Sequence, residues 1–248
     1  MKYLSLLLLL LLVSCSENEL FKNDIFNNGD VWKYSLETHP ESADSNIINP
    51  KYADSTILIL YTEIYDSENF YKTHNYNDSV TITGDISELD GELVNRWVEY
   101  YPVKDKKANN TTSTIKVTKV ELYFPSLGDE VLWYNLPKLQ IDGSLEVNET
   151  EEDELSYKNS DGEEIQYPYT LKYLGKVYYS NPVVKDSCDH YQIDFIFKGN
   201  DKKYNGKKCS LNYYFHEEHG FVYIKLNIGT SEYYKLEVID IKQEGEDV

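Results

Sequence analysis

The chain carries little positive charge. Lys and Arg total 24 against 43 Asp and Glu, a formal net charge of −19, and Arg96 is the only arginine. A nucleic-acid-binding protein needs clustered positive charge to displace the counterions of the phosphate backbone. We therefore exclude nucleic acid from the expected partners.

The sequence also lacks the short motifs that mark common enzyme sites. It holds no GxSxG nucleophile elbow, no phosphate-binding loop and no GxGxxG dinucleotide fingerprint. No pair of carboxylates stands out as the acid and base of a glycoside hydrolase. We predict a protein that is not an enzyme, has no catalytic residues and needs no cofactor.

Only one long apolar run is present, and it lies at the amino terminus. Lys2 precedes the run Leu6–Val13, which is shorter than the about 20 residues that a membrane-spanning helix needs. The run ends in Leu12-Val13-Ser14-Cys15, which resembles the lipobox of bacterial lipoproteins. The resemblance implies that residues 1–14 are a signal peptide and that Cys15 becomes the amino terminus, diacylated and then usually acylated again.

The residues after Cys15 bear on the location. The next residue is Ser16 and not an aspartate, the usual signal for retention in the inner membrane, and Glu17 and Glu19 resemble the export signal of surface lipoproteins in Bacteroidetes. Two or three acyl chains give durable anchoring, whereas a single chain binds only marginally. We expect an outer-membrane lipoprotein, held there by its lipid anchor, on the periplasmic or the surface-exposed face.

Cysteine is scarce, and after Cys15 only Cys188 and Cys209 remain. Exported proteins fold in an oxidising compartment, so these two residues can form a disulfide. Such a bond would close a loop of about 20 residues and stabilise the fold by about 3 kcal/mol. Two free, buried thiols are the alternative, and the sequence leaves the choice open.

Residues that favour β structure are abundant. Hydrophobic residues are 41% and aromatic residues 14% of the chain, including 24 tyrosines, and they alternate with polar residues in the pattern of half-buried strands. We predict a lipidated tether over residues 15–29 and a single all-β domain over residues 30–248. The expected fold is a curved antiparallel sheet or half-barrel with at most one or two short helices, and a β-sandwich is the alternative. The predicted strands are Val31–Glu37, Thr56–Tyr65, Ser79–Thr83, Thr114–Phe124, Val131–Asn135, Thr170–Ser180, His190–Lys198, Lys208–Phe215, Phe221–Ile228 and Glu232–Ile241.

Three segments have a less regular pattern. Ile86–Tyr100 has the spacing of a short helix, with an edge strand Arg96–Tyr101 as the rival. The turn residues 159–162 predict a hairpin between Leu155–Lys158 and Glu163–Tyr167. Residues 142–164 hold ten acidic residues against one lysine, which favours a solvated loop over a calcium site.

Two further patterns resemble the LolA-like half-barrel proteins, among them the TapB-like family. Residues 28–34 are similar to their opening strand, which contains a glycine, a tryptophan and a tyrosine, and Phe215–Lys225 is similar to a late strand that follows a turn. In these proteins a long curved antiparallel sheet encloses an apolar groove. The resemblance implies the same fold here and does not imply an activity.

Histidine offers one possible metal-binding pattern. Asp189-His190 and His216-Glu217-Glu218-His219 contain residue types that bind transition metals. The spacing is not that of HExxH, and the second segment lies in a predicted turn between strands. We therefore interpret it as a polar hairpin tip and predict no metal site.

Adjacent tyrosines occur within several predicted strands. Because neighbouring strand residues point to opposite faces, each pair places one ring in the core and one outside. An outward ring can contact a ligand, and the possible contacts are Tyr100, Tyr178, Tyr213 and Tyr233. The main functional hypothesis is a non-enzymatic, lipid-anchored envelope protein that binds an apolar ligand or a partner protein in a concave sheet. The alternative is a surface glycan-binding lipoprotein of a polysaccharide-uptake system.

Overall fold

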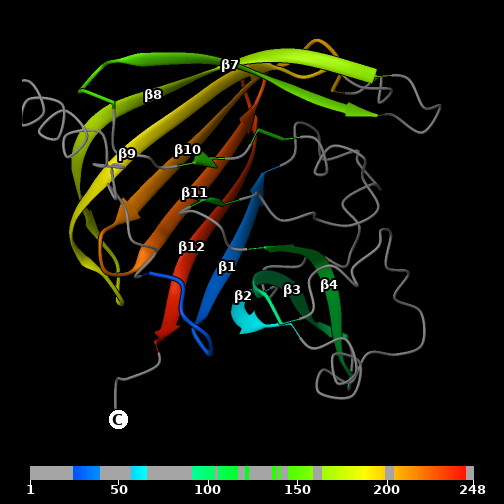
Figure 1. Ribbon diagram of the computed structural model, residues 1–248, viewed down its shortest axis with the longest axis vertical. Helices are drawn as coiled ribbons and strands as arrows, with labels where there is room; N and C mark the ends of the chain where they lie inside the picture. Colours follow the sequence, from blue (N-terminus) through cyan, green and yellow to red (C-terminus); the bar gives the residue numbers. More distant parts are fainter. Residues whose placement is uncertain are drawn as a thin grey trace, which may run out of the picture.

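The computed structural model describes residues 25–39, 57–65, 91–103, 106–116, 121–122, 136–137, 139–140, 145–158, 164–198 and 204–243. Within these residues every regular element is a strand (Figure 1). The strands are β1 Val31–His39, β2 Ile57–Ile64, β3 Leu93–Val103, β4 Lys106–Lys116, β5 Glu121–Leu122, β6 Leu139–Gln140, β7 Thr150–Lys158, β8 Glu164–Ser180, β9 Lys185–Ile196, β10 Lys208–His216, β11 Gly220–Ile228 and β12 Glu232–Lys242. Among the described residues, no helix has the length and apolarity to cross a membrane.

Ten strands form one open antiparallel sheet. Their order is β4-β3-β2-β1-β12-β11-β10-β9-β8-β7, so β12 returns to pair with β1 and the two edges are β4 and β7. Figure 1 shows the sheet curving, with β8 and β9 bent most visibly along their length. The predicted curved all-β sheet is confirmed. The β-sandwich alternative is wrong, because the large sheet is continuous and, among the described strands, β5 and β6 alone form a separate pair.

Alternation divides the large sheet into two faces. We call the apolar side the buried face. It carries Leu211 and Tyr213 of β10, Ile224 of β11 and Leu236 of β12, all fully buried. We call the opposite side the exposed face. Trp32 and Trp97 belong to the core as predicted, with exposed fractions of 0% and 1%, and Trp133 lies outside the described residues.

The amino-terminal segment before β1 is part of the folded domain. Ile25 and Phe26 are buried in the main core, and the Phe26 ring meets Trp32 edge to face at 5.2 Å. The Trp32 indole N–H donates to the backbone carbonyl of His219 at 2.8 Å. The predicted tether over residues 15–29 is therefore too long at its carboxyl end, because two apolar side chains of that segment pack against the domain. Residues 15–24, including Cys15, lie outside the described residues, as does the signal peptide.

The expected helix over Ile86–Tyr100 is wrong from residue 93 onward. Those residues belong to β3, which pairs with β2 from Leu93 to Tyr100 and contains the rival strand Arg96–Tyr101. The Arg96 side chain is buried and donates to the Glu63 carboxylate at 2.6 Å. Long-range pairing and this ion pair therefore override the local helical spacing.

The acidic segment is also more ordered than expected. Thr150–Lys158 is strand β7 and pairs with β8 from Thr150↔Lys172 to Lys158↔Glu164, so the predicted hairpin is confirmed and the predicted loop is wrong over these residues. The acidic residues Glu151–Glu154 are exposed. β7 is an edge strand, where charged side chains hinder pairing with another sheet.

The other strand predictions have mixed outcomes. The strands predicted over Lys208–Phe215, Phe221–Ile228 and Glu232–Ile241 are confirmed within β10, β11 and β12, whereas His190–Lys198 is confirmed only as far as Ile196, where β9 ends. Thr170–Ser180 is the carboxyl-terminal part of β8. Thr114–Phe124 is not one strand, because β4 ends at Lys116 and β5 pairs instead with β6. Ser79–Thr83 and Val131–Asn135 lie outside the described residues.

Candidate functional site

One line of side chains crosses the exposed face near one end of the sheet. Consecutive members lie directly opposite one another in seven neighbouring strands, from β7 to β1. This cross-strand row consists of Glu152, Thr170, Asp194, Ser210, Asn227, Tyr233 and His39. All members lie on the same face, because paired residues of adjacent strands point to the same side.

Two cavities follow the cross-strand row. The first has a volume of about 760 Å³ and is lined by the row from Glu152 to Asn227, together with Ile196 and Lys208. The second has a volume of about 470 Å³ and contains Tyr233 and His39. Both are lined by Asn227 and Gly229, so they meet at the β11–β12 turn. We call the two cavities together the groove.

Several polar side chains in the groove have no partner. Within the described part of the chain, the side chains of Glu152, Thr170, Asn227 and Lys208 make no hydrogen bond or ion pair. They provide a carboxylate, a hydroxyl, an amide and an ammonium group, which are donors and acceptors of different kinds. A ligand in the groove would find these groups available without breaking an internal interaction.

The adjoining part of the exposed face is internally paired. The Tyr233 hydroxyl and the Lys235 ammonium both contact the Glu37 carboxylate, and the Tyr179 hydroxyl donates to Glu237 at 2.9 Å. The hydrogen bond from Lys235 is the main cause that lowers the pKa of Glu37, and the same contact raises the pKa of Lys235. Unpartnered polar groups therefore gather in the groove and not along this neighbouring network.

The tyrosines predicted as ligand contacts have different positions. Tyr178 is 68% exposed but lies near the end of β8 away from Thr170. Tyr213 is fully buried, so its prediction as a surface contact is wrong. Its neighbour Tyr214 lies on the opposite face and stacks on Tyr223 at 4.6 Å, as the alternation of the pair predicts. Tyr100 lies on β3, and its side chain is outside the described part of the structure.

Tyr233 lines the groove but cannot stack on a ligand. The His39 ring is parallel to the Tyr233 ring at a centroid distance of 5.4 Å, and the Lys225 ammonium lies 4.4 Å from the ring centroid. Both contacts use faces of the ring, and the hydroxyl donates to Glu37. Tyr233 therefore contributes ring edges and neighbouring charges to the second cavity.

Cys188 and Cys209 are both free and buried. Asp189 of β9 lies opposite Phe215 of β10, whereas Cys209 lies opposite Phe195. The two cysteines are therefore about seven residues apart along the strands, or about 23 Å. A disulfide requires Cα atoms within about 7 Å, so the disulfide alternative is wrong and the free-thiol alternative is confirmed.

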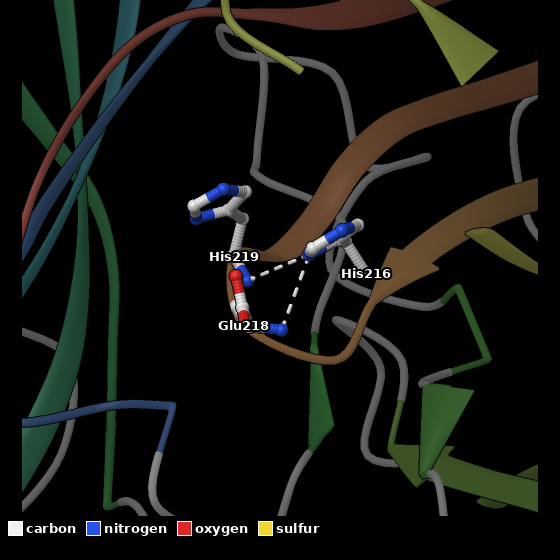
Figure 2. Close-up of side chains that lie close together, drawn as sticks. All are labelled: His216, Glu218 and His219. Carbon is white, nitrogen blue, oxygen red and sulfur yellow. Dashed lines mark hydrogen bonds between the residues drawn. The ribbon is translucent and has the colours of Figure 1, made fainter. Parts of the chain in front are cut away.

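The histidine pair in the β10–β11 turn forms a compact group with Glu218. Figure 2 shows the three side chains, whose potential ligand atoms lie within 4.8 Å of one another. The His216 Nδ1 accepts the backbone N–H groups of Glu218 and His219 at 3.1 and 3.3 Å. A neutral ring that accepts at Nδ1 carries its proton on Nε2, which lies 3.6 Å from the Asp186 carboxylate. A metal ion at Nε2 would move that proton to Nδ1, against the two N–H groups. His216 is therefore a turn-stabilising residue in this conformation.

The residues of the groove were not singled out by the sequence, apart from Tyr233. Thr170, Asp194 and Asn227 are ordinary polar residues at alternating strand positions, and Lys208 begins a strand. Only the pairing register brings them onto one line. The alternation itself was the available signal, because it assigns these residues to the polar face of their strands.

No protein-family model, no curated protein and no solved structure matches this chain.

Proposed function

We propose that this protein is a non-enzymatic, lipid-anchored protein of the outer membrane that binds an oligosaccharide in the groove. The carrying observation is the set of unpartnered polar side chains in the groove, including Thr170, Asn227 and Lys208. Sugars present many hydroxyl groups, each able to donate and to accept. A binding site for them needs a few correctly placed amide, hydroxyl and charged groups in a hollow.

The floor of the groove supports the same ligand class. Ile196 is 48% exposed within the first cavity, beside Pro168. A sugar ring has apolar C–H faces as well as hydroxyl edges, so it gains from an apolar floor with polar walls. A purely apolar ligand would instead bury these polar groups without giving them hydrogen-bond partners, and the cost of their desolvation would weaken binding.

The place of the groove relative to the amino terminus suits a surface role. Ile25 packs against Gly220, where an added Cβ would lie 3.0 Å from the isoleucine Cγ2, so the chain enters the domain at the β10–β11 turn. β1 runs from Val31 near this turn to His39 in the groove, a length of about 26 Å. The groove therefore lies at the end of β1 opposite to the point where the chain coming from Cys15 enters the domain.

An apolar ligand on the buried face has less support. In the described part of the chain, that face is covered by side chains of the protein itself, including Ile25, Phe26, Leu139 and Tyr204. An apolar ligand would have to displace them. The strongly negative charge also gives no reason to restore nucleic acid as a partner.

Native gels containing polysaccharides test the proposal. We expect the purified mature protein to be retarded by at least one of cellulose derivatives, mannan, xylan, galactan and pectin. Asn227→Ala, which changes a side chain shared by both cavities, should reduce the retardation, and Tyr178→Ala, an exposed ring away from the groove, should leave it unchanged. Equal mobility in all gels, or equal retardation of the Asn227 variant and the parent, would refute the proposal.

A further inference from the structure

We infer that the groove binds an extended oligosaccharide that runs across the strands and occupies both cavities at once. This inference rests on the proposed function and names the size and direction of its ligand. It follows from the position of the two cavities on one cross-strand row, with Asn227 and Gly229 shared between them.

The length of the row sets the size of the ligand. It links seven strands without a gap, from Glu152 on β7 to His39 on β1. Neighbouring strands lie about 4.8 Å apart, so the row is about 29 Å long. A disaccharide is much shorter than this and would fill one cavity only.

Between the two cavities lie a glycine and an amide side chain. Gly229 has no side chain to separate them, and its φ of +62° lets the backbone turn sharply between β11 and β12. The Asn227 amide lies beside this turn and lines both cavities. A ligand that crosses the junction can therefore use the same amide from either side.

Each cavity has a polar side chain that the other lacks. Thr170 lines only the first cavity, and Ser231 lines only the second. Neither side chain makes a hydrogen bond within the described residues. Thr170→Ala removes a hydroxyl and a methyl group from the first cavity alone, and Ser231→Ala removes a hydroxyl from the second cavity alone, so each variant reports on one cavity.

Isothermal titration of the mature protein with cello-, manno-, xylo- and galacturono-oligosaccharides, from disaccharide to octasaccharide, tests the inference. For the series that binds, affinity should rise about tenfold or more from the disaccharide to the hexasaccharide and then level off. Thr170→Ala and Ser231→Ala should each weaken the hexasaccharide several-fold, whereas only one of them should weaken the disaccharide. Tyr178→Ala should change neither.

Different failures have different meanings. A disaccharide that binds as tightly as the hexasaccharide, or a hexasaccharide that is insensitive to one of the two alanine variants, would overturn the extended ligand and leave the proposed function intact. Absence of binding by all four series, together with equal mobility in all polysaccharide gels, would refute the proposed function itself and this inference with it.

Discussion

The Asn181 side chain links the β8–β9 turn to strand β12 by hydrogen bonds. We expect its removal to lower the free energy of unfolding substantially. The side chain is buried and makes four hydrogen bonds. Its Nδ2 donates to the Tyr179 hydroxyl at 3.0 Å and to the Val238 carbonyl at 2.8 Å. Its Oδ1 accepts the backbone N–H groups of Val183 and Val184 at 2.8 and 2.7 Å. One amide thus provides hydrogen-bond partners for two backbone N–H groups of the turn and for one backbone carbonyl of β12.

The expected loss follows from these contacts. A hydrogen bond contributes about 1 kcal/mol net, and a buried group left without a partner costs about 1–3 kcal/mol. Asn181→Ala removes four bonds and leaves the buried N–H of Val184 and the carbonyl of Val238 without this partner. We expect a fall of about 4 kcal/mol in the free energy of unfolding, a large part of the stability of a typical domain.

Urea unfolding of the mature protein, followed by the fluorescence of the buried tryptophans, measures this loss. Lys185→Ala is the control, because Lys185 is an exposed residue just after the same turn, and it should change stability by less than about 0.5 kcal/mol. A loss below about 1 kcal/mol for the Asn181 variant would refute the reasoning, since the turn would then be held without the side chain.

Three further predictions concern the reactivity of the two cysteines, the replacement of two glycines and the dependence of stability on acidic pH. Burial raises the pKa of Cys188 to about 11 and that of Cys209 to about 12, so neither thiol should alkylate in the native protein at mildly alkaline pH. Mass spectrometry should find two alkylated thiols after unfolding without reductant, and a single disulfide would contradict the free thiols. Gly220→Ala should destabilise more than Gly91→Ala in urea titrations, because both have positive φ but only Gly220 faces Ile25 closely; equal losses would contradict the docking of Ile25. The lowered pKa of Glu37, caused first by the Lys235 hydrogen bond, means that its ionised form stabilises the fold above the ordinary glutamate pKa and that this contribution is lost as the pH falls through the lowered value. Glu37→Gln should therefore lose less stability than the parent on acidification, and parallel pH profiles would argue against the ion pair.

The strands in the last part of the chain could be predicted from the sequence because their signal is local. Lys208–Phe215, for example, alternates apolar and polar residues, is bounded by turn residues and matches β10 to within one residue. β3 could not be predicted in the same way, since its partner β2 lies about 30 residues earlier and its own spacing also suits a helix. Pairing with β2 makes this segment a strand.

The residues that line the groove could not be predicted from the sequence for a related reason. Asp194, Ser210 and Asn227 are neighbours only because three strands pair in one register. A slip of one residue in any strand would move its member to the buried face. The alternation predicts which face each residue occupies, but the sequence does not state which residues stand opposite one another.

The acidity of the chain has a structural role in β7. The sheet is open, so among the described strands β7 and β4 each have one edge without a neighbouring strand. In β7 four successive acidic residues, Glu151–Glu154, are exposed on such an edge. An incoming strand would have to bring its backbone against this charge, and a second copy of β7 would bring the same charge. These four exposed acidic residues therefore hinder extension of the sheet at β7, and Glu152 also lines one end of the groove, where the proposed oligosaccharide would meet it.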